Sequence, residues 1–323
     1  MENKEIRPDS LFKVKVVLAF VAIYFVWGST FSMVSIALKA FSPLVLNTFR
    51  FLLGGLLLSV YCTIKRYSFP AFSELIKYVV LGIIIFMGGV VAVVWAQQYI
   101  SSSLTSIIIT TPFWFLVLDR PNWKNNFSSP FIITGIILGF TGVIVLMLNR
   151  HSISISSSMT VYTVPAILII VLGSFLWAGG SLYLKYNPGT TSILVRTSIQ
   201  LISVGLVCLS ICLINGSLQK IRWDEVPADA LLSILYLSIM STTITFIAFI
   251  WLLQHRSPAI VSTYSYVNPL VAALLGSFLL HEKISFIQII AMLIILSGVL
   301  LINFRSYRTL LKKSYLKFIP SSK

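Results

Sequence analysis

The chain is poor in charge for its length. Only 10% of its 323 residues are charged, whereas about 25% is usual for a soluble domain. Acidic residues are the scarcest, with 9 Asp and Glu against 24 Lys and Arg, while 57% of all residues are hydrophobic. Water cannot solvate such a surface on all sides. The composition therefore excludes an ordinary soluble domain and predicts a protein whose main solvent is lipid.

Residues that hold metals or carry out acid–base chemistry are also few. The chain has three cysteines and three histidines, and neither set has the spacing of a metal or redox site. A membrane enzyme needs convergent His, Asp or Glu side chains, and no predicted span carries a carboxylate at its centre. We therefore expect no enzyme, no metal and no cofactor.

The net charge of +15 would suggest a nucleic-acid partner in a soluble protein. Lys and Arg also accumulate in the cytoplasmic loops of membrane proteins, and that interpretation fits this composition better. We expect no nucleic-acid partner.

Long apolar runs are what the chain has in abundance. A run of about 17–25 apolar residues crosses a hydrocarbon core of roughly 30 Å. Ten such runs predict an all-α integral membrane protein with ten transmembrane helices. The predicted spans, one to ten in order, are residues 14–36, 44–64, 76–96, 101–118, 131–148, 164–184, 194–214, 231–253, 258–280 and 286–303.

The basic residues predict how these spans are oriented. With a cytoplasmic N-terminus, most of the 24 Lys and Arg residues fall in cytoplasmic segments, as the positive-inside rule requires. The first span is longer than the apolar region of a signal peptide, so we expect it to be retained. The sequence thus predicts a multi-pass protein of the cell (inner, cytoplasmic) membrane with both termini cytoplasmic.

The landmarks of the first half recur in the second half, in the same order. Each half holds five spans, an odd number, so the second half enters the membrane upside down. Inverted repeats of this kind are typical of secondary transporters, whose substrate site lies near the midplane between the halves. We expect the first five-helix repeat at 1–150 and the second, with a basic tail, at 151–323. The aligned pairs are Trp27 with Trp177, Arg50 with Arg196, Pro112 with Pro269, and Gly142 with Gly298.

Five stretches together carry a family resemblance. They are WGSTF at 27–31, SPLVLNTFRFLLGG at 42–55, SSSLTSIIITTPFW at 101–114, WAGGSLY at 177–183, and SPAIVSTYSYVNPLVAALLG at 257–276 followed by Glu282. In this order, over nearly the whole chain, they resemble the drug/metabolite transporter superfamily, specifically its EamA-type ten-helix exporters. The resemblance implies a 5+5 inverted-repeat exporter of amino acids, related metabolites or drugs, often driven by the proton gradient.

The chain departs from this family pattern at one point. The acidic residue that follows the proline helix is present in the second half as Glu282, whereas Asn125 or Asn126 takes its place in the first half. A role that requires a carboxylate in both halves does not transfer to this chain.

Prolines interrupt spans four and nine, with hydroxyl and amide groups beside each of them. Pro112 and Pro269 cannot donate to the carbonyl one turn earlier, and lipid cannot satisfy that carbonyl. The breaks are either packing kinks or parts of a cavity wall, and we favour the cavity because both halves have them. The candidate substrate-binding residues are Trp27, Thr30, Gln98, Thr111, Trp114, Trp177, Ser181, Tyr266 and Asn268.

The few charges inside spans are candidate gating residues, because a charge at membrane depth is costly and usually has a partner. Arg50 and Arg196 each either snorkel to the nearer interface or pair with helix-end carbonyls or acids. A contact between Arg50 and Glu282 is one option at the outer side. Its inner counterpart is a hydrogen bond from Arg196 to Asn125 or Asn126.

Proton coupling needs a titratable group in the transport pathway. Glu282 is the first candidate. Asp119 is a second one, although beside Arg120 we expect it to form a plain surface pair. The sequence leaves the coupling ion open, with protons as the candidate.

The leading hypothesis is a secondary exporter of small metabolites that are zwitterionic or aromatic-tolerant, since hydroxyls, amides and rings suit such solutes. An antiporter of phosphorylated sugars or nucleotide sugars would need several cations, and only Arg50 and Arg196 are available. A non-transporting structural or sensory membrane protein is the alternative from another class. The expected partners are a small-molecule substrate and the bilayer, and the oligomeric state stays open.

Overall fold

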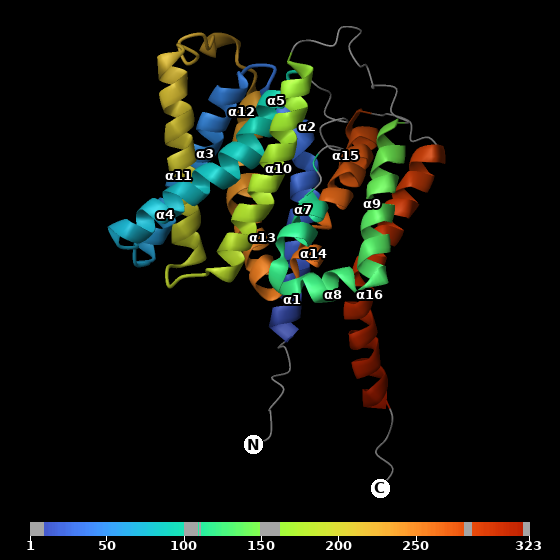
Figure 1. The fold of residues 1–323 in the computed structure, drawn as a ribbon. Helices are drawn as coiled ribbons and strands as arrows, with labels where there is room; N and C mark the ends of the chain where they lie inside the picture. Colours follow the sequence, from blue (N-terminus) through green and yellow to red (C-terminus); the bar gives the residue numbers. More distant parts are fainter. Residues whose placement is uncertain (1–9, 100–108, 110, 149–161, 281–285, 319–323) are drawn as a thin grey trace.

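Helices make up all the regular structure among the residues described, which are 10–99, 109, 111–148, 162–280 and 286–318 of a computed structural model (Figure 1). Six helices are long and apolar enough to cross a membrane by themselves. The other four predicted spans are also helical wherever the structure describes them. The predicted all-α membrane fold is confirmed.

The first half contains spans one to five. Span one is a continuous helix with a π-helical segment, and so is span three. Span four is described mainly in its second part, and a short helix that runs at 92° to span five follows it. The elements are α1 (Ser10–Val21), η1 (Ala22–Val26), α2 (Trp27–Ala37), α3 (Pro43–Ile64), α4 (Phe72–Gly82), η2 (Ile83–Val91), α5 (Ala92–Ala96), α7 (Thr111–Leu118), η3 (Arg120–Asn122), α8 (Trp123–Phe127) and α9 (Pro130–Leu148).

The second half contains spans six to ten. Span eight again carries a π-helical segment, span nine is divided in two, and span ten continues well past its predicted end. The elements are α10 (Thr163–Tyr186), α11 (Ile193–Ile214), η4 (Trp223–Glu225), α12 (Ala228–Tyr236), η5 (Leu237–Ile244), α13 (Thr245–His255), α14 (Pro258–Val261), α15 (Tyr264–Leu280) and α16 (Phe286–Phe318).

The prolines do not break the helices where the sequence suggested. Pro269 lies inside α15, and the interruption of span nine comes earlier, at Ser262 and Thr263. There the side-chain hydroxyls donate to the carbonyls three residues back, 3.0 Å away for Ser262 and 2.7 Å for Thr263, and such local bonds compete with the helix. Pro112 lies in the first turn of α7, where its missing N–H is not needed.

The two halves interlock through equivalent helices. α3 packs along α11 and α9 along α16, and these are the most extensive helix contacts of the molecule. Gly135 and Gly298 bring α9 and α16 together so closely that a Cβ on either would lie 2.7 Å from the carbonyl oxygen of the other. Small residues allow such an approach between membrane helices. Because each pair joins corresponding helices of the two halves, the packing is what a pseudo-two-fold relation produces.

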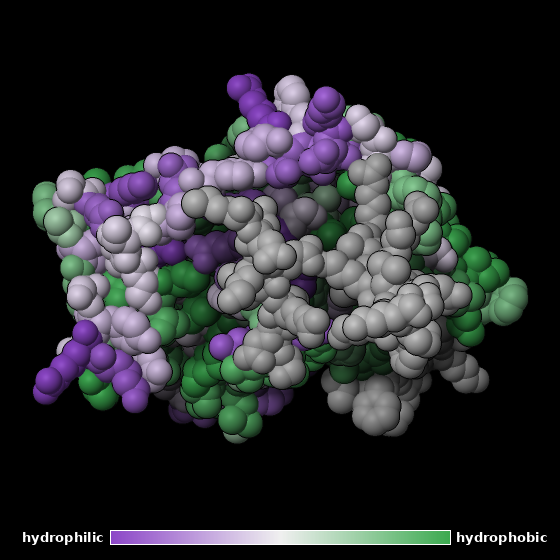
Figure 2. All heavy atoms as spheres, turned by 90° about the horizontal axis from the view of Figure 1, so that it is seen from below, coloured by the Kyte–Doolittle hydropathy of each residue, from purple (hydrophilic) through white to green (hydrophobic). Residues whose placement is uncertain are grey.

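The ends of the described chain lie on one side of the molecule. α1 begins and α16 ends at the bottom of Figure 1. We call this side the termini face and the opposite side the far face. Seen from below, hydrophilic side chains gather over part of the termini face, and hydrophobic ones form much of its margin (Figure 2). Many large apolar side chains are exposed on the spans, including Ile214 at 87% and Leu232 at 64%, as expected where lipid is the solvent.

Candidate functional site

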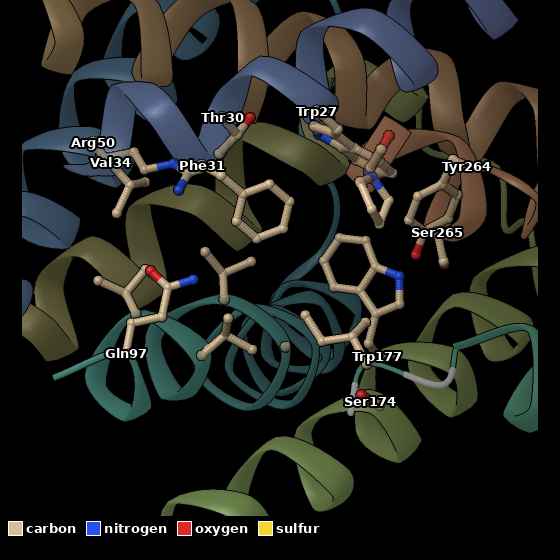
Figure 3. A pocket seen from close by; sticks show the side chains of 17 residues that line it. Trp27, Thr30, Phe31, Val34, Arg50, Gln97, Ser174, Trp177, Tyr264 and Ser265 are labelled. Atoms are coloured by element: carbon tan, nitrogen blue, oxygen red, sulfur yellow. The ribbon is translucent and has the colours of Figure 1, made fainter. Parts of the chain in front are cut away.

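A cavity of about 150 Å³ lies between the two halves of the chain (Figure 3). Spans one, two and three of the first half form one part of its wall, and α10 and α15 of the second half form another. The cavity extends from the middle of spans one, six and nine toward the far-face ends of spans one and three. Its main polar and aromatic lining residues are Trp27, Thr30, Arg50, Gln97, Trp177, Tyr264 and Asn268.

Aromatic side chains form the termini-side end of this cavity. The ring centroids of Trp27 lie 5.7 Å from those of Trp177 and 4.8 Å from those of Tyr264, both edge-to-face. Phe249 stacks on Trp177 at 5.6 Å and also contacts Trp27 and Tyr264. We call Trp27, Trp177, Phe249 and Tyr264 the aromatic floor. Each such pair adds about 0.5–1.5 kcal/mol beyond its burial, so the floor is a firmly packed layer.

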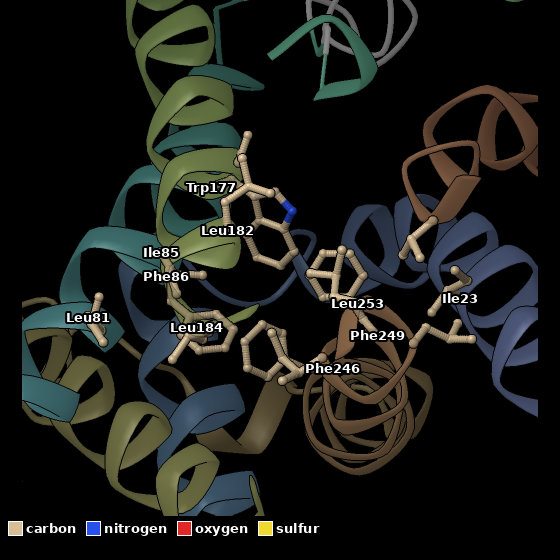
Figure 4. Close-up of a cluster of buried hydrophobic side chains, with 14 of the residues drawn as sticks. Ile23, Leu81, Ile85, Phe86, Trp177, Leu182, Leu184, Phe246, Phe249 and Leu253 are labelled. Carbon is tan, nitrogen blue, oxygen red and sulfur yellow. The ribbon is translucent and has the colours of Figure 1, made fainter. Parts of the chain in front are cut away.

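The packed core continues from the floor toward the termini face. Phe86 and Phe246 lie against Trp177, with ring centroids 6.1 Å and 5.9 Å away. Leu182 and Leu253 belong to the same buried cluster (Figure 4). The described side chains below the cavity are therefore closely packed apolar groups.

Arg50 lies in the cavity wall, about two turns from the start of α3. Only 5% of its surface is exposed. Its Nε donates to Thr242 Oγ1, and its Nη2 donates to Ser241 Oγ at 3.1 Å. Within the described part of the chain, Arg50 forms no ion pair with a carboxylate. It is a buried cation held by neutral hydroxyls.

The partners of Arg50 belong to η5, which ties spans one and two to span eight. The Nε1 of Trp27 donates to the carbonyl oxygen of Ser241 at 3.0 Å, and Thr30 Oγ1 lies 2.9 Å from Ser241 Oγ. Ser241 and Thr242 were not among the residues predicted from the sequence. Their signal is the run STTIT at 241–245, because polar residues at membrane depth need partners.

Asn268 joins span nine to the π-helical segment of span one. When its amide nitrogen faces the backbone, it donates to the carbonyls of Ile23, Tyr24 and Tyr264 over 3.0–3.2 Å, an orientation assigned from the hydrogen-bond network. π-helical turns disturb the regular pattern of backbone bonds, and inside a membrane a side-chain amide is one of the few groups that can satisfy a carbonyl. Tyr24 also hydrogen-bonds Thr263 at 2.7 Å between the hydroxyl oxygens.

Four of the nine predicted substrate-binding residues line this cavity. They are Trp27, Thr30, Trp177 and Asn268, and the predicted break residue Pro269 and gating residue Arg50 line it as well. These residues come from spans one, two, six and nine. The internal repeat alone could not predict that these four spans meet at one cavity.

Other predicted residues lie apart from it. Gln98 is exposed and donates to the Trp95 carbonyl at 3.1 Å, while the preceding Gln97 lines the cavity. Trp114 packs against Phe175, with ring centroids 5.3 Å apart. Ser181 is fully buried one turn below Trp177.

Tyr266 and Pro112 line a second cavity, of about 230 Å³, between α7, α9 and α15. The hydroxyl of Tyr266 donates to the Ile136 carbonyl at 3.2 Å. Thr111 begins α7, but its side chain lies outside the described part of the chain, as does Glu282 as a whole. The Arg50–Glu282 contact is therefore still a prediction.

The internal repeat paired Arg196 with Arg50, but Arg196 is the fourth residue of α11 whereas Arg50 is the eighth of α3, and the surroundings of the two side chains differ. Its guanidinium carbon lies 6.0 Å from the ring centroid of Tyr78, and its Nε and Nη1 are buried without a hydrogen-bond partner. Among the described residues, the expected hydrogen bond from Arg196 to Asn125 or Asn126 is not formed; the Asn126 amide nitrogen lies 3.5 Å from Asp119 Oδ2.

Asp119 is completely buried, which corrects the expected surface pair with Arg120. Tyr186 donates its hydroxyl to Oδ1, and Asn122 Nδ2 donates to Oδ2 at 3.0 Å. The sequence could not show this burial, because it depends on a tertiary contact with Tyr186, which lies 67 residues away in the sequence.

Lys185 adds a second link on the same side. Its Nζ donates to the carbonyl oxygen of Leu253 and, at 3.1 Å, to that of Arg256. The last carbonyls of a helix have no partner within it, so Lys185 caps α13. We call Asp119, Asn122, Lys185 and Tyr186 the termini-side latch, which joins spans four, six and eight.

The donors of the cavity suit an organic solute. In the described part of the chain, no group of three or more His, Cys, Asp or Glu side chains is placed to hold a metal ion. A guanidinium, two amides, three Ser or Thr hydroxyls and four aromatic side chains line the cavity instead.

Comparison with known proteins extends these observations. The chain matches the model of the EamA-like transporter family in two segments, residues 14–148 and 164–304. It is 27% identical over 292 residues to the uncharacterized inner membrane transporter YedA of Escherichia coli strain K12, over 90% of each chain. It is 28% identical over 296 residues to an uncharacterized transporter of Archaeoglobus fulgidus, over 88% of this chain and 95% of that one. A crystal structure with 16% identity shares the fold, with a TM-score of 0.71 over 92% of this chain and 99% of that one.

Proposed function

Because the chain belongs to the EamA-like transporter family, we propose that it is a secondary transporter that moves small metabolites by alternating access. The observation that carries this proposal is the cavity between the two halves, with the aromatic floor and the termini-side latch on one side of it. Inverted-repeat transporters bind substrate near the midplane at the repeat interface and rock one part against the other. This packing is one of the two states that such a cycle requires.

The charge distribution supports a cytoplasmic termini face. Lys and Arg of short connections mark the cytoplasmic side. With this orientation the cavity extends toward the outside, and the floor and latch close the cytoplasmic side. The described basic residues in or beside connections are Lys65, Arg66, Arg120, Lys124, Lys185 and Arg256 at the termini face, and Lys39, Lys220 and Arg222 at the far face.

Export of amino acids, related metabolites or drugs fits this cavity best. Its neutral donors and aromatic floor accept solutes with a polar group and an apolar body. Phosphorylated sugars and nucleotide sugars are less well supported, because a phosphate clamp needs several cations and Arg50 is the only Lys or Arg among the described lining residues. Coupling to protons is part of the proposal, with Asp119 and Glu282 as the carboxylates available to carry them.

Counterflow in liposomes tests the transport proposal. Purified protein is reconstituted, the liposomes are loaded with unlabelled amino acids or related metabolites, and uptake of the labelled compound is followed. We expect counterflow above that of empty liposomes for at least one compound class. Val93→Trp, which fills the cavity, should abolish it. The matched substitution Val164→Trp, at a side chain that is 57% exposed, should not.

Two outcomes contradict parts of the proposal. If no compound class shows counterflow, the chain does not transport these solutes, and a structural or sensory role gains support. If counterflow is present but an imposed pH gradient leaves net flux unchanged, only the proton coupling fails.

A further inference from the structure

We propose that Arg50 binds the carboxylate of a substrate whose ring-sized apolar body rests on the aromatic floor, so that the cavity selects small anionic carboxylates over their neutral and cationic analogues. This inference rests on the proposed transport function and names the substrate class of the same cavity.

The first support is the charge of Arg50, which no carboxylate in the described part of the chain balances. A cation at membrane depth is costly and usually faces a cavity or a partner. The hydroxyls of Ser241 and Thr242 orient the guanidinium, but they carry no charge to neutralise it. No Asp or Glu occurs among the described residues that line the cavity. A buried charge without a counter-ion is strongly unfavourable, and an anionic substrate supplies that counter-ion.

The second support is the geometry of the guanidinium group. Thr242 and Ser241 occupy its side edge, which consists of Nε and one hydrogen of Nη2. Nη1 and the second hydrogen of Nη2 form the end-on edge, and this edge can bind both oxygens of a carboxylate. Figure 3 shows the Arg50 nitrogens directed toward Phe31, another residue of the cavity lining.

The third support is the short distance between Arg50 and the floor. Ser241 contacts both, because its hydroxyl accepts from Arg50 Nη2 at 3.1 Å and its carbonyl accepts from Trp27 Nε1 at 3.0 Å. A ligand with one ring and a short linker can therefore reach from the guanidinium to the indole. The cavity volume of about 150 Å³ is the size of an apolar cavity that accepts benzene.

The same groups disfavour a cation. An ammonium ion can lie over the face of Trp27, Trp177 or Tyr264, but Arg50 repels it within the same small space. The described lining offers it only neutral acceptors, such as the side-chain oxygens of Thr30 and Gln97. A neutral amide, in turn, lacks the charge that balances Arg50.

Three ligands of nearly equal size test this selectivity. They are phenylacetate, its neutral isostere phenylacetamide, and the cationic 2-phenylethylamine. Binding to the purified full chain is followed by quenching of tryptophan fluorescence, because Trp27 and Trp177 form the floor. We expect phenylacetate to bind at least tenfold more tightly than phenylacetamide, and 2-phenylethylamine to bind more weakly than both.

Two substitutions assign the selectivity to Arg50. Arg50→Gln should reduce the tenfold preference for the acid to about one. Arg50→Lys should keep part of it, because lysine retains the charge but loses the planar fork. If Arg50 only supports the fold, Arg50→Gln weakens the three ligands by the same factor, and this result would overturn the proposal. A wild-type chain without preference for the acid overturns it even if Arg50→Gln does not fold.

The outcome is separable from that of the transport proposal. A chain that gives counterflow with other solutes but shows no preference for the acid loses this inference and remains a transporter. A chain that shows no counterflow for any compound yet prefers the acid through Arg50 keeps the anion site and loses the transport function.

Discussion

At the scale of single residues, Gly28 sets the distance between spans one and nine beside the cavity. A Cβ at this position would lie 2.6 Å from the Cβ of Val271 and 3.3 Å from the carbonyl oxygen of Asn268. Side chains do not approach so closely, and Val271 is held by its own helix. A methyl group at Gly28 must therefore push α2 away from α15 and disturb the bonds of Asn268 to span one.

We expect Gly28→Ala to destabilise the fold by about 1–3 kcal/mol, as overpacking in a dense core does. Thermal unfolding of the purified protein in detergent should show this as a lower melting temperature. Gly179→Ala is the matched control, because only Leu118 comes within 4 Å of its added Cβ, at 3.8 Å. Equal melting temperatures for the two variants would contradict the packing argument.

Single residues also show where sequence reasoning succeeds. Trp27 and Trp177 were paired by the internal repeat, and both line the cavity, because the repeat relates positions without any knowledge of the packing. The role of Ser241 and the burial of Asp119 could not be predicted in this way. Ser241 matters through its contacts with spans one and two, and Asp119 is buried against Tyr186 of span six, so both depend on tertiary packing.

At the scale of the element, the π-helical segments η2 and η5 occupy corresponding places in the two halves. The chemistry they present differs. η5 offers the hydroxyls of Ser241 and Thr242 to Arg50, whereas η2, with the sequence IIIFMGGVV, contains no hydroxyl side chain. The two π-helical segments thus correspond in their backbone but not in the chemistry of their side chains, and only η5 binds an arginine of span two.

Because η5 binds Arg50 through the hydroxyl of Thr242, we expect the fold to lose stability when a methyl group replaces this hydroxyl. Thr242→Val leaves the Nε–H of a buried guanidinium without its acceptor, which costs about 1–3 kcal/mol. Its melting temperature should fall below that of Thr134→Val, a control in which the lost hydroxyl bonds only its own helix, to the Pro130 carbonyl, on an exposed face. A control variant that is as destabilised as Thr242→Val would show that Arg50 does not depend on this bond.

The limits of span two were predictable from hydrophobicity, whereas the break in span nine was not. Span two was expected at 44–64 and is α3, Pro43–Ile64, since the bilayer thickness fixes the length of an apolar helix. Span nine was expected to break at Pro269, yet it breaks at Ser262 and Thr263. A proline removes one donor, while two consecutive hydroxyls that bond local carbonyls redirect the chain itself. The sequence alone does not show which of these two effects decides where the helix breaks.

At the scale of the whole molecule, the cavity and the packed layer beneath it define one side as closed. Ser174 and Ser181 lie on the same face of α10, seven residues apart, with Trp177 between them. Ser174 lines the cavity, whereas Ser181 is fully buried on the termini side of the floor. The two serines therefore report on opposite sides of the same barrier.

Cysteines at these two positions should react differently with a small, membrane-impermeant methanethiosulfonate. In a background that lacks the three native cysteines, all of them buried, we expect Ser174→Cys to be modified from the far-face side at least tenfold faster than Ser181→Cys.

Asp119→Asn weakens the latch, because the amide replaces a carboxylate that accepts from Tyr186 and Asn122. It should therefore raise the modification rate of Ser181→Cys from the termini side and lower that of Ser174→Cys, since alternating access exposes one side at the expense of the other. A substitution at Asp119 that raises both rates together would indicate general loosening of the fold and contradict the two-state cycle.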